Sequence, residues 1–135
     1  MSNTIEVTQW TNYFRDFSER NLKRSVRLEI FDELGAQTEV KKLPLAGISV
    51  ELDGKDAPRL EIMLGGLSAD ESGHLTHTVT KVTKILSRAD DNDIEDAVEF
   101  ISENGVKTLL CLEDKEFQAE RKPKFRVAEF PSWLF

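Results

Sequence analysis

The sequence predicts an α+β domain that is mainly β-structure, with one N-terminal helix followed by about six antiparallel strands in a bent sheet or small barrel. Three observations predict this fold class. Aromatic residues recur at helical spacing in residues 8–20. From residue 24 onwards, apolar residues mostly alternate with polar ones, as in strands that bury one face. Glycine, proline and asparagine divide this part of the chain into pieces of strand length.

The helix is expected over residues 8–20. Thr8 can cap its N-terminus, and Trp10, Phe14 and Phe17 lie on one face of it. A helix of this length is not stable in water on its own. Its aromatic face is therefore expected to pack against the rest of the domain.

The first strand is expected over residues 24–31, where Val26 and Leu28 alternate with charged residues. Leu34-Gly35 then marks a hairpin turn, because glycine readily adopts the positive φ that a tight turn requires.

A second extended segment covers residues 38–52. Pro44 interrupts it, because proline cannot donate a hydrogen bond to a central sheet ladder, and Gly47 adds a second flexible point. The pair predicts a bulge or a sharp bend. Such a bend would let the small sheet curl into a barrel or half-barrel, with the helix closing one opening.

The middle of the chain contains one clear strand and one ambiguous segment. Residues 60–64 alternate and end at a pair of glycines. Helical and strand signals compete in residues 67–80, where we expect a loop or one helical turn. A strand over residues 81–88 and an acidic connector over residues 90–96 complete this part.

The last two strands form the hairpin with the clearest turn signal. Asn104-Gly105 lies between two apolar segments within residues 98–112 and fits a type I′ turn of two residues. That turn would place Phe100 opposite Leu109 on the core face.

Charge and aromatic residues are unevenly distributed along the chain. The net charge is −7, and residues 115–135 hold five basic and three acidic residues, so residues 1–114 carry −9. Nine of the eleven aromatic residues lie near the two ends. We expect a single domain over residues 1–114 and a basic-aromatic tail over residues 115–135. The acidic body disfavours a protein that grips nucleic acid with its whole surface.

The sequence predicts a cytoplasmic location. Its first residues lack the basic start and apolar run of a secretory signal, and no apolar stretch is long enough to span a bilayer. The single cysteine, Cys111, cannot form an internal disulfide, and its apolar neighbours predict a small buried hydrophobic residue.

Short motifs over the first half of the chain occur in a recognisable order and spacing. They are Trp10, Tyr13-Phe14, Phe17-Ser18, Leu34-Gly35, Gln37, Glu39, Leu43-Pro44-Leu45, Gly47-Ile48, Leu60-Glu61-Ile62 and Leu64-Gly65-Gly66-Leu67. In this arrangement the chain resembles a bacterial family of uncharacterised proteins, the domain of unknown function numbered five-three-three-five. The likeness covers residues 8–67 and continues more loosely to about residue 112, whereas the tail after Asp114 does not match. The resemblance implies a bacterial, soluble, single-domain protein and implies no activity.

Two histidines offer the only candidate metal ligands. His74 and His77 are spaced i, i+3, and Asp70 and Glu71 precede them. A zinc site needs three or four protein ligands held rigidly, so two solvated histidines are the simpler interpretation. No set of nucleophile, base and acid can be assembled, and we predict no catalytic residue and no cofactor.

The tail carries the main functional hypothesis. Its aromatic residues can fold back onto their own domain or bind another chain, either a sister subunit or a different protein. The candidate docking residues are Trp10, Phe14, Phe17, Phe125, Phe130, Trp133 and Phe135. The basic residues of the tail are Arg121, Lys122, Lys124 and Arg126.

The sequence thus favours a non-enzymatic binding or assembly module that uses its aromatic tail, with a homodimer or another protein as partner and no membrane contact. The alternative is a small metal-dependent enzyme or metal-binding protein that uses the His74 and His77 segment. A third hypothesis is weak binding of single-stranded nucleic acid by the basic-aromatic tail, on which bases could stack.

Overall fold

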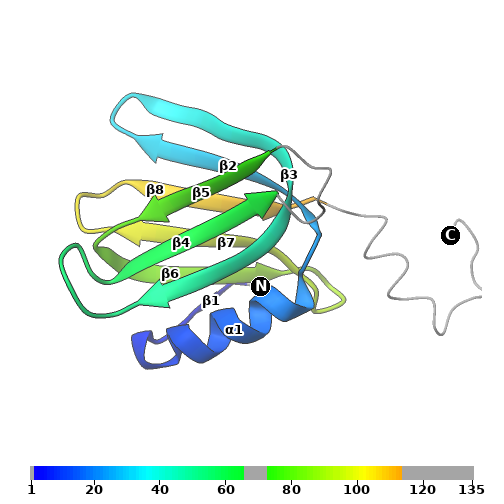
Figure 1. The fold of residues 1–135 in the computed structure, drawn as a ribbon, viewed down its shortest axis with the longest axis horizontal. Helices are drawn as coiled ribbons and strands as arrows, with labels where there is room; N and C mark the ends of the chain where they lie inside the picture. The colour runs from blue at the N-terminus through cyan, green and yellow to red at the C-terminus, as the bar shows by residue number, and fades with distance from the viewer. Residues whose placement is uncertain (1, 66–72, 114–135) are drawn as a thin grey trace, which may run out of the picture.

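The computed structural model describes residues 2–65 and 73–113. In chain order, the elements of these residues are β1 (Ser2–Thr4), a 3₁₀ turn η1 (Val7–Gln9), α1 (Trp10–Arg20), β2 (Ser25–Asp32), β3 (Gly35–Glu51), β4 (Arg59–Gly65), β5 (His74–Val79), β6 (Val82–Ala89), β7 (Glu95–Ser102) and β8 (Lys107–Leu112). The predicted fold class, one N-terminal helix with an antiparallel sheet, is confirmed (Figure 1). Neither described helix is long and apolar enough to cross a membrane.

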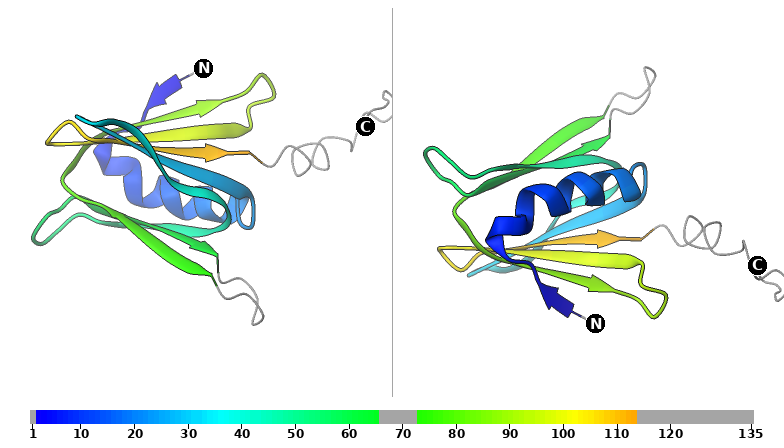
Figure 2. Two further views of the ribbon diagram at one scale, coloured as in Figure 1. Left: turned by 90° about the horizontal axis from the view of Figure 1, so that it is seen from above. Right: turned by 90° about the horizontal axis from the view of Figure 1, so that it is seen from below.

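One long strand bends the sheet into two layers. The strand order is β1-β6-β7-β8-β2-β3-β4-β5, with antiparallel neighbours throughout. The first part of β3 pairs with β2 as far as Pro44, and from Leu45 onwards it pairs with β4. The register shifts between Leu45 and Gly47, which confirms the predicted bend. Figure 2 shows β6, β7 and β8 in one layer and β4 and β5 in the other.

The sheet is bent and open. Its two terminal strands, β1 and β5, do not pair with each other among the described residues. Of the two predicted shapes, the bent sheet is therefore observed and the closed barrel is not. We refer below to the layer of β1, β6, β7, β8 and β2 as the larger layer.

The core lies between the two layers and α1, which covers one open side (Figure 2). The predicted aromatic stripe makes this contact: Trp10 is 2% exposed, and Phe14 and Phe17 are completely buried. Phe14 stacks on Phe100 of β7 with 5.8 Å between ring centroids. The Trp10 indole N–H donates to the carbonyl of Ile5 at 2.9 Å, so its polar atom is also satisfied.

The start of the helix differs from the prediction. Thr8 lies inside the 3₁₀ turn, and α1 begins at Trp10 after Gln9, with no side-chain cap. The tighter turn takes up the position at which Thr8 would have capped an α-helix, so the prediction of that cap is wrong.

The prediction of a loop or one helical turn over residues 67–80 is wrong for residues 74–79. Residues 74–79 form the strand β5, which pairs with β4 from Gly65↔His74 to Leu60↔Val79. Its threonines face outward, where β-branched side chains favour extended backbone, and its apolar residues face the core. Together with β1, this strand raises the number of strands from the predicted six to eight. Residues 67–72 of the predicted loop lie outside the described residues.

The closing hairpin is one residue out of the predicted register. Phe100 pairs with Thr108, not with Leu109. Gly105 has a positive φ of 89°, whereas Asn104 does not, and the Asn104 side chain instead accepts a hydrogen bond from the Val106 N–H at 3.1 Å. The loop therefore has three residues in place of two, which shifts the pairing by one.

Candidate binding surface

The predicted docking residues of the helix have no exposed ring surface. Trp10, Phe14 and Phe17 are part of the core, sealed by strands of both layers. These three rings are therefore not accessible to a docking segment. The tail candidates lie outside the described residues, and their roles stay predictions: Arg121, Lys122, Lys124, Phe125, Arg126, Phe130, Trp133 and Phe135.

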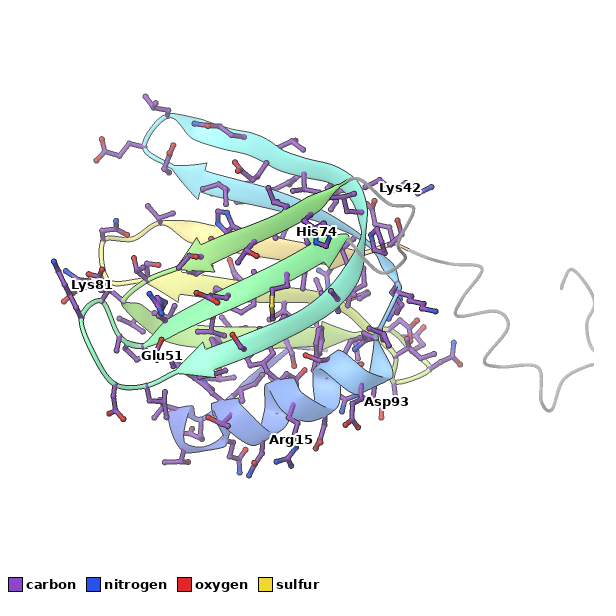
Figure 3. The ribbon with its side chains drawn as sticks, in the orientation of Figure 1. Arg15, Lys42, Glu51, His74, Lys81 and Asp93 are labelled. Carbon is purple, nitrogen blue, oxygen red and sulfur yellow. The ribbon has the colours of Figure 1, made fainter. Side chains whose placement is uncertain are left out.

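The two histidines do not form a shared site. Residues three apart in a strand point to opposite faces. His74, labelled in Figure 3, is exposed, whereas His77 is half-buried on the core side. Burial lowers the pKa of His77, and the negative charge of Glu39 partly opposes this shift. No group of three or more potential metal ligands occurs within residues 2–65 and 73–113. The two side chains cannot bind one ion in this strand, and Asp70 and Glu71 lie outside the described residues.

A polar cluster that the sequence analysis did not predict connects the C-terminal end of α1 to β7 by hydrogen bonds and an ion pair. Arg24 is completely buried, and its Nη1 donates to Asn21 Oδ1 and to the Glu95 carbonyl, at 2.9 Å in both cases. The Glu95 carboxylate forms an ion pair with Arg20. The guanidinium of Arg20 in turn lies 5.7 Å from the centre of the Tyr13 ring. The cluster is structural, since its groups satisfy one another between the helix and the sheet.

The larger layer has a second face, turned away from the core, which we call the outer face. Residues directly opposite in antiparallel strands share a face, and one row across four strands runs Arg27, Cys111, Ala97 and Arg88. A neighbouring row runs Glu29, Leu109, Glu99 and Leu86. Apolar and charged side chains are thus mixed on this face. Its apolar members, all buried or half-buried, are Phe31, Leu86, Ala97, Ile101, Leu109 and Cys111.

β8 is apolar on both faces. Leu110 and Leu112 enter the core, whereas Leu109 and Cys111 lie on the outer face. A continuous apolar run of this kind is typical of a strand covered on both sides. The described residues place the core over one side only. This run was the sequence signal that could have identified the outer face.

The Cys111 thiol is not an activated nucleophile. Burial raises its pKa, and the nearby Arg27 guanidinium, with Nη2 at 3.5 Å from Sγ, opposes the shift only in part. Arg27 also forms ion pairs with Glu29, at 2.9 Å, and with Glu113. Cys111 is half-buried and lies on the outer face of β8, not in the core. The prediction of a buried cysteine is therefore wrong. The shift in hairpin register is the reason.

Hollows lie on the outer face of the described part of the chain. One of about 460 Å³ lies at the end of β8, beside Cys111 and Glu113, and a small one of about 90 Å³ lies over Leu109 and Ala97. A further hollow, of about 580 Å³, is lined by residues 31–34 and 104–107, at the tips of the β2–β3 and β7–β8 hairpins. We call it the hairpin-tip hollow.

The hairpin-tip hollow combines apolar surface with negative charge. Phe31 and Val106 are half-buried in its wall, and Leu34 is 86% exposed at its rim. Within the described part of the chain, Asp32 and its neighbour Glu33 form no ion pair, whereas Lys107 lies 3.7 Å from Glu99. The hollow is therefore suited to a ligand that is both apolar and cationic.

The sequence profile of the Family of unknown function (DUF5335) matches residues 1–121. No curated protein and no solved structure matches the chain. The matched part runs seven residues past Asp114, so the expectation that the family likeness stops there is wrong. The match covers most of the chain and agrees with the resemblance carried by the motifs from Trp10 to Leu67. The chain therefore belongs to the DUF5335 family.

Proposed function

We propose that this protein is a non-enzymatic binding or assembly module whose binding element is the C-terminal segment, residues 115–135. The proposed partner is the protein's own domain or a sister subunit. A bacterial, cytoplasmic setting is part of the proposal and rests on the sequence and on the family resemblance.

The observation that carries the proposal is the place where the segment begins. It follows Glu113 at the end of β8, the strand that is apolar on both faces. The last described residue before this segment of five aromatic residues, Glu113, thus lines a hollow on a partly apolar sheet face. Aromatic anchors seated in such hollows are a common source of binding energy.

Neither the Cys111 thiol nor the histidine pair of β5 is arranged for catalysis or metal binding. The raised pKa of Cys111 keeps its thiol protonated near neutral pH, and a thiol is a weak nucleophile. His74 and His77 point to opposite faces of β5. Both observations favour a binding role over a catalytic one.

The test compares the full chain with a chain that ends at Glu113, by mass in solution and by melting temperature. We expect truncation to lower the number of chains per particle, the melting temperature or both, because the aromatic contacts are lost. The full-length variant Phe130→Ala/Trp133→Ala/Phe135→Ala is expected to reproduce the effect. A control variant, Glu116→Gln/Glu129→Gln, changes the same segment without removing an aromatic ring. An unchanged number of chains per particle together with an unchanged melting temperature in the truncated chain would refute the proposal.

A further inference from the structure

We propose that residues 115–126 run back along the outer face of their own chain's β8 and place the stretch 121–126 in the hairpin-tip hollow. This inference rests on the proposed function, since it requires the C-terminal segment to be the binding element. It adds the acceptor surface and assigns the occupant to the same chain.

The first argument is the uncovered apolar surface of β8. Leu109 and Cys111 on the outer face are flanked by Ala97 of β7 in the paired strand. Half-buried apolar side chains in a row are the expected floor for a segment that lies across a sheet. The row begins next to Glu113, where the C-terminal segment leaves the strand.

The second argument is reach. β8 has six residues, and at about 3.3 Å per residue it spans roughly 20 Å from the hairpin-tip hollow to Leu112. After a reversal within residues 114–116, an extended return of equal length needs about six further residues. Arg121 and Lys122 then arrive beside Lys107, at the edge of the hollow. The segment after β8 is therefore long enough to reach the hollow of its own chain.

The third argument is apolar complementarity. Phe117, at the start of the return, would lie over the Cys111 and Leu109 end of the outer face. Phe125 would reach the apolar wall of the hollow, formed by Phe31 and Val106. A volume of about 580 Å³ accommodates an aromatic ring together with a neighbouring basic side chain. The ring would also cover Leu34, which is 86% exposed in the described structure.

The fourth argument is charge. Four cations surround Phe125 in the sequence, and the hollow presents Asp32 and Glu33 without an ion pair to any other described residue. The segment carries +2 and the remainder of the chain −9. Ion pairs of this exposed kind are screened by salt, so docking should weaken as ionic strength rises. The cations are Arg121, Lys122, Lys124 and Arg126.

Disulfide trapping in the full chain tests the placement. In a Cys111→Ser background, Ala36→Cys and Val127→Cys are introduced and oxidised with oxidised glutathione. Ala36 pairs with Phe31, is exposed and lies beside the hollow, so the change removes none of the proposed contacts. The matched control joins Val127→Cys to Arg15→Cys, since Arg15 points away from the sheet on α1 (Figure 3).

We expect the Ala36→Cys pair to form an intramolecular disulfide at least about tenfold faster than the Arg15→Cys control, because docking raises the local concentration of the thiol. Adding Asp32→Asn/Glu33→Gln, or raising the salt concentration, should reduce this rate severalfold. Equal rates in the two pairs would overturn the inference. A disulfide that joins two chains would overturn the same-chain assignment and make a second copy the occupant.

The truncation experiment separates this inference from the proposed function. If removing residues 114–135 lowers the melting temperature while the Ala36→Cys pair reacts no faster than the control, the binding role stands and the acceptor surface is wrong. If truncation changes neither the number of chains per particle nor the melting temperature, the proposed function and this inference are both refuted.

Discussion

The buried guanidinium of Arg24 donates to the backbone carbonyl of Glu95 at 2.9 Å, although 71 residues separate them in the chain. This contact fixes the end of α1 against the first residue of β7. The same guanidinium nitrogen reaches the side chain of Asn21, which donates to the Phe17 carbonyl at 3.0 Å. The helix that closes the core is thus held at its C-terminal end by hydrogen bonds, not only by its aromatic face.

Replacing Arg24 with Met should lower the free energy of unfolding by about 2 to 3 kcal/mol. A buried acceptor on Asn21 and a partly buried one on Glu95 would lose a charged donor, and hydrogen bonds to charged groups contribute about 1.5 to 3 kcal/mol. Urea unfolding followed by circular dichroism measures the change. The control Arg15→Met removes an exposed arginine from α1 and should change the free energy by less than about 0.5 kcal/mol. Equal effects of the two variants would contradict the assigned role of Arg24.

Gly65 should tolerate no side chain. Its φ is +77°, and an added Cβ would lie 2.0 Å from the carbonyl oxygen of Gly73, which is backbone and cannot move aside cheaply. Gly54 also has a positive φ, +103°, but nothing lies within 4 Å of an added Cβ. We expect Gly54→Ala to cost about 1 to 2 kcal/mol from backbone strain alone. Gly65→Ala should cost clearly more in the same unfolding assay, and a smaller loss would show that β4 and β5 do not approach so closely there.

The domain should lose stability as the pH falls below about 6.5 because of His77. Burial lowers the pKa of this imidazole in the folded protein from its ordinary value of 6.5, so the unfolded chain binds the proton more readily. Stability is therefore complete above pH 6.5 and declines as the pH falls through the folded-state pKa. Melting temperatures of the protein and of His77→Gln, measured from pH 8 to pH 5, isolate this effect by difference.

A change at Glu39 tests the predicted direction of the His77 effect on stability. Its charge raises the pKa of His77 and so offsets part of the lowering by burial. In Glu39→Gln the loss of stability at acidic pH should be larger than in the unmodified protein. A smaller loss would mean that the two side chains do not interact as the structure indicates.

The Cys111 thiol should react slowly with iodoacetamide in the folded protein. Its raised pKa leaves little thiolate at neutral pH, and only the thiolate attacks. Arg27→Gln removes the charge that holds this pKa down in part, so the reaction should become slower still. Alkylation rates followed by mass spectrometry across pH 7 to 10 test both statements, and a faster reaction in the Arg27 variant would disprove the second.

The sequence predicted those features of the fold that depend on interactions between residues close together in the chain. The spacing of Trp10, Phe14 and Phe17 predicted α1 and its buried face, and Pro44 with Gly47 predicted the bend of β3. In each case the side chain or the backbone restriction acts within a few residues. Such features depend little on what the rest of the chain does.

Pairings that form between distant segments were not predicted. β1 is a polar strand of three residues that pairs with β6, and nothing in its sequence distinguishes it from a loop. β5 resembled both a helix and a strand, and only the exposed edge of β4 decides between them. The register of the closing hairpin depended on Asn104, whose side chain bonds to Val106 and so lengthens the turn.

The same limit applies to the candidate surface. The apolar run of residues 109–112 was visible, but which of its members face outward depends on the hairpin register. The hairpin-tip hollow joins residues 31–34 to residues 104–107, and only the pairing of β2 with β8 brings these two tips together. A surface made by two hairpins is a property of the sheet and not of either segment.

The bent strand β3 also determines how the domain can open. Leu45, at the bend, is completely buried, and its backbone accepts from Lys23 N–H and donates to the Arg24 carbonyl, both at 2.8 Å. The two layers cannot separate from each other without displacing Leu45 and breaking these hydrogen bonds. Amide hydrogen exchange should therefore show a single slow group of protons that spans both layers and is centred on Leu45, in place of two independently exchanging halves. The protein would then unfold as one cooperative unit, in which neither layer opens independently of the other.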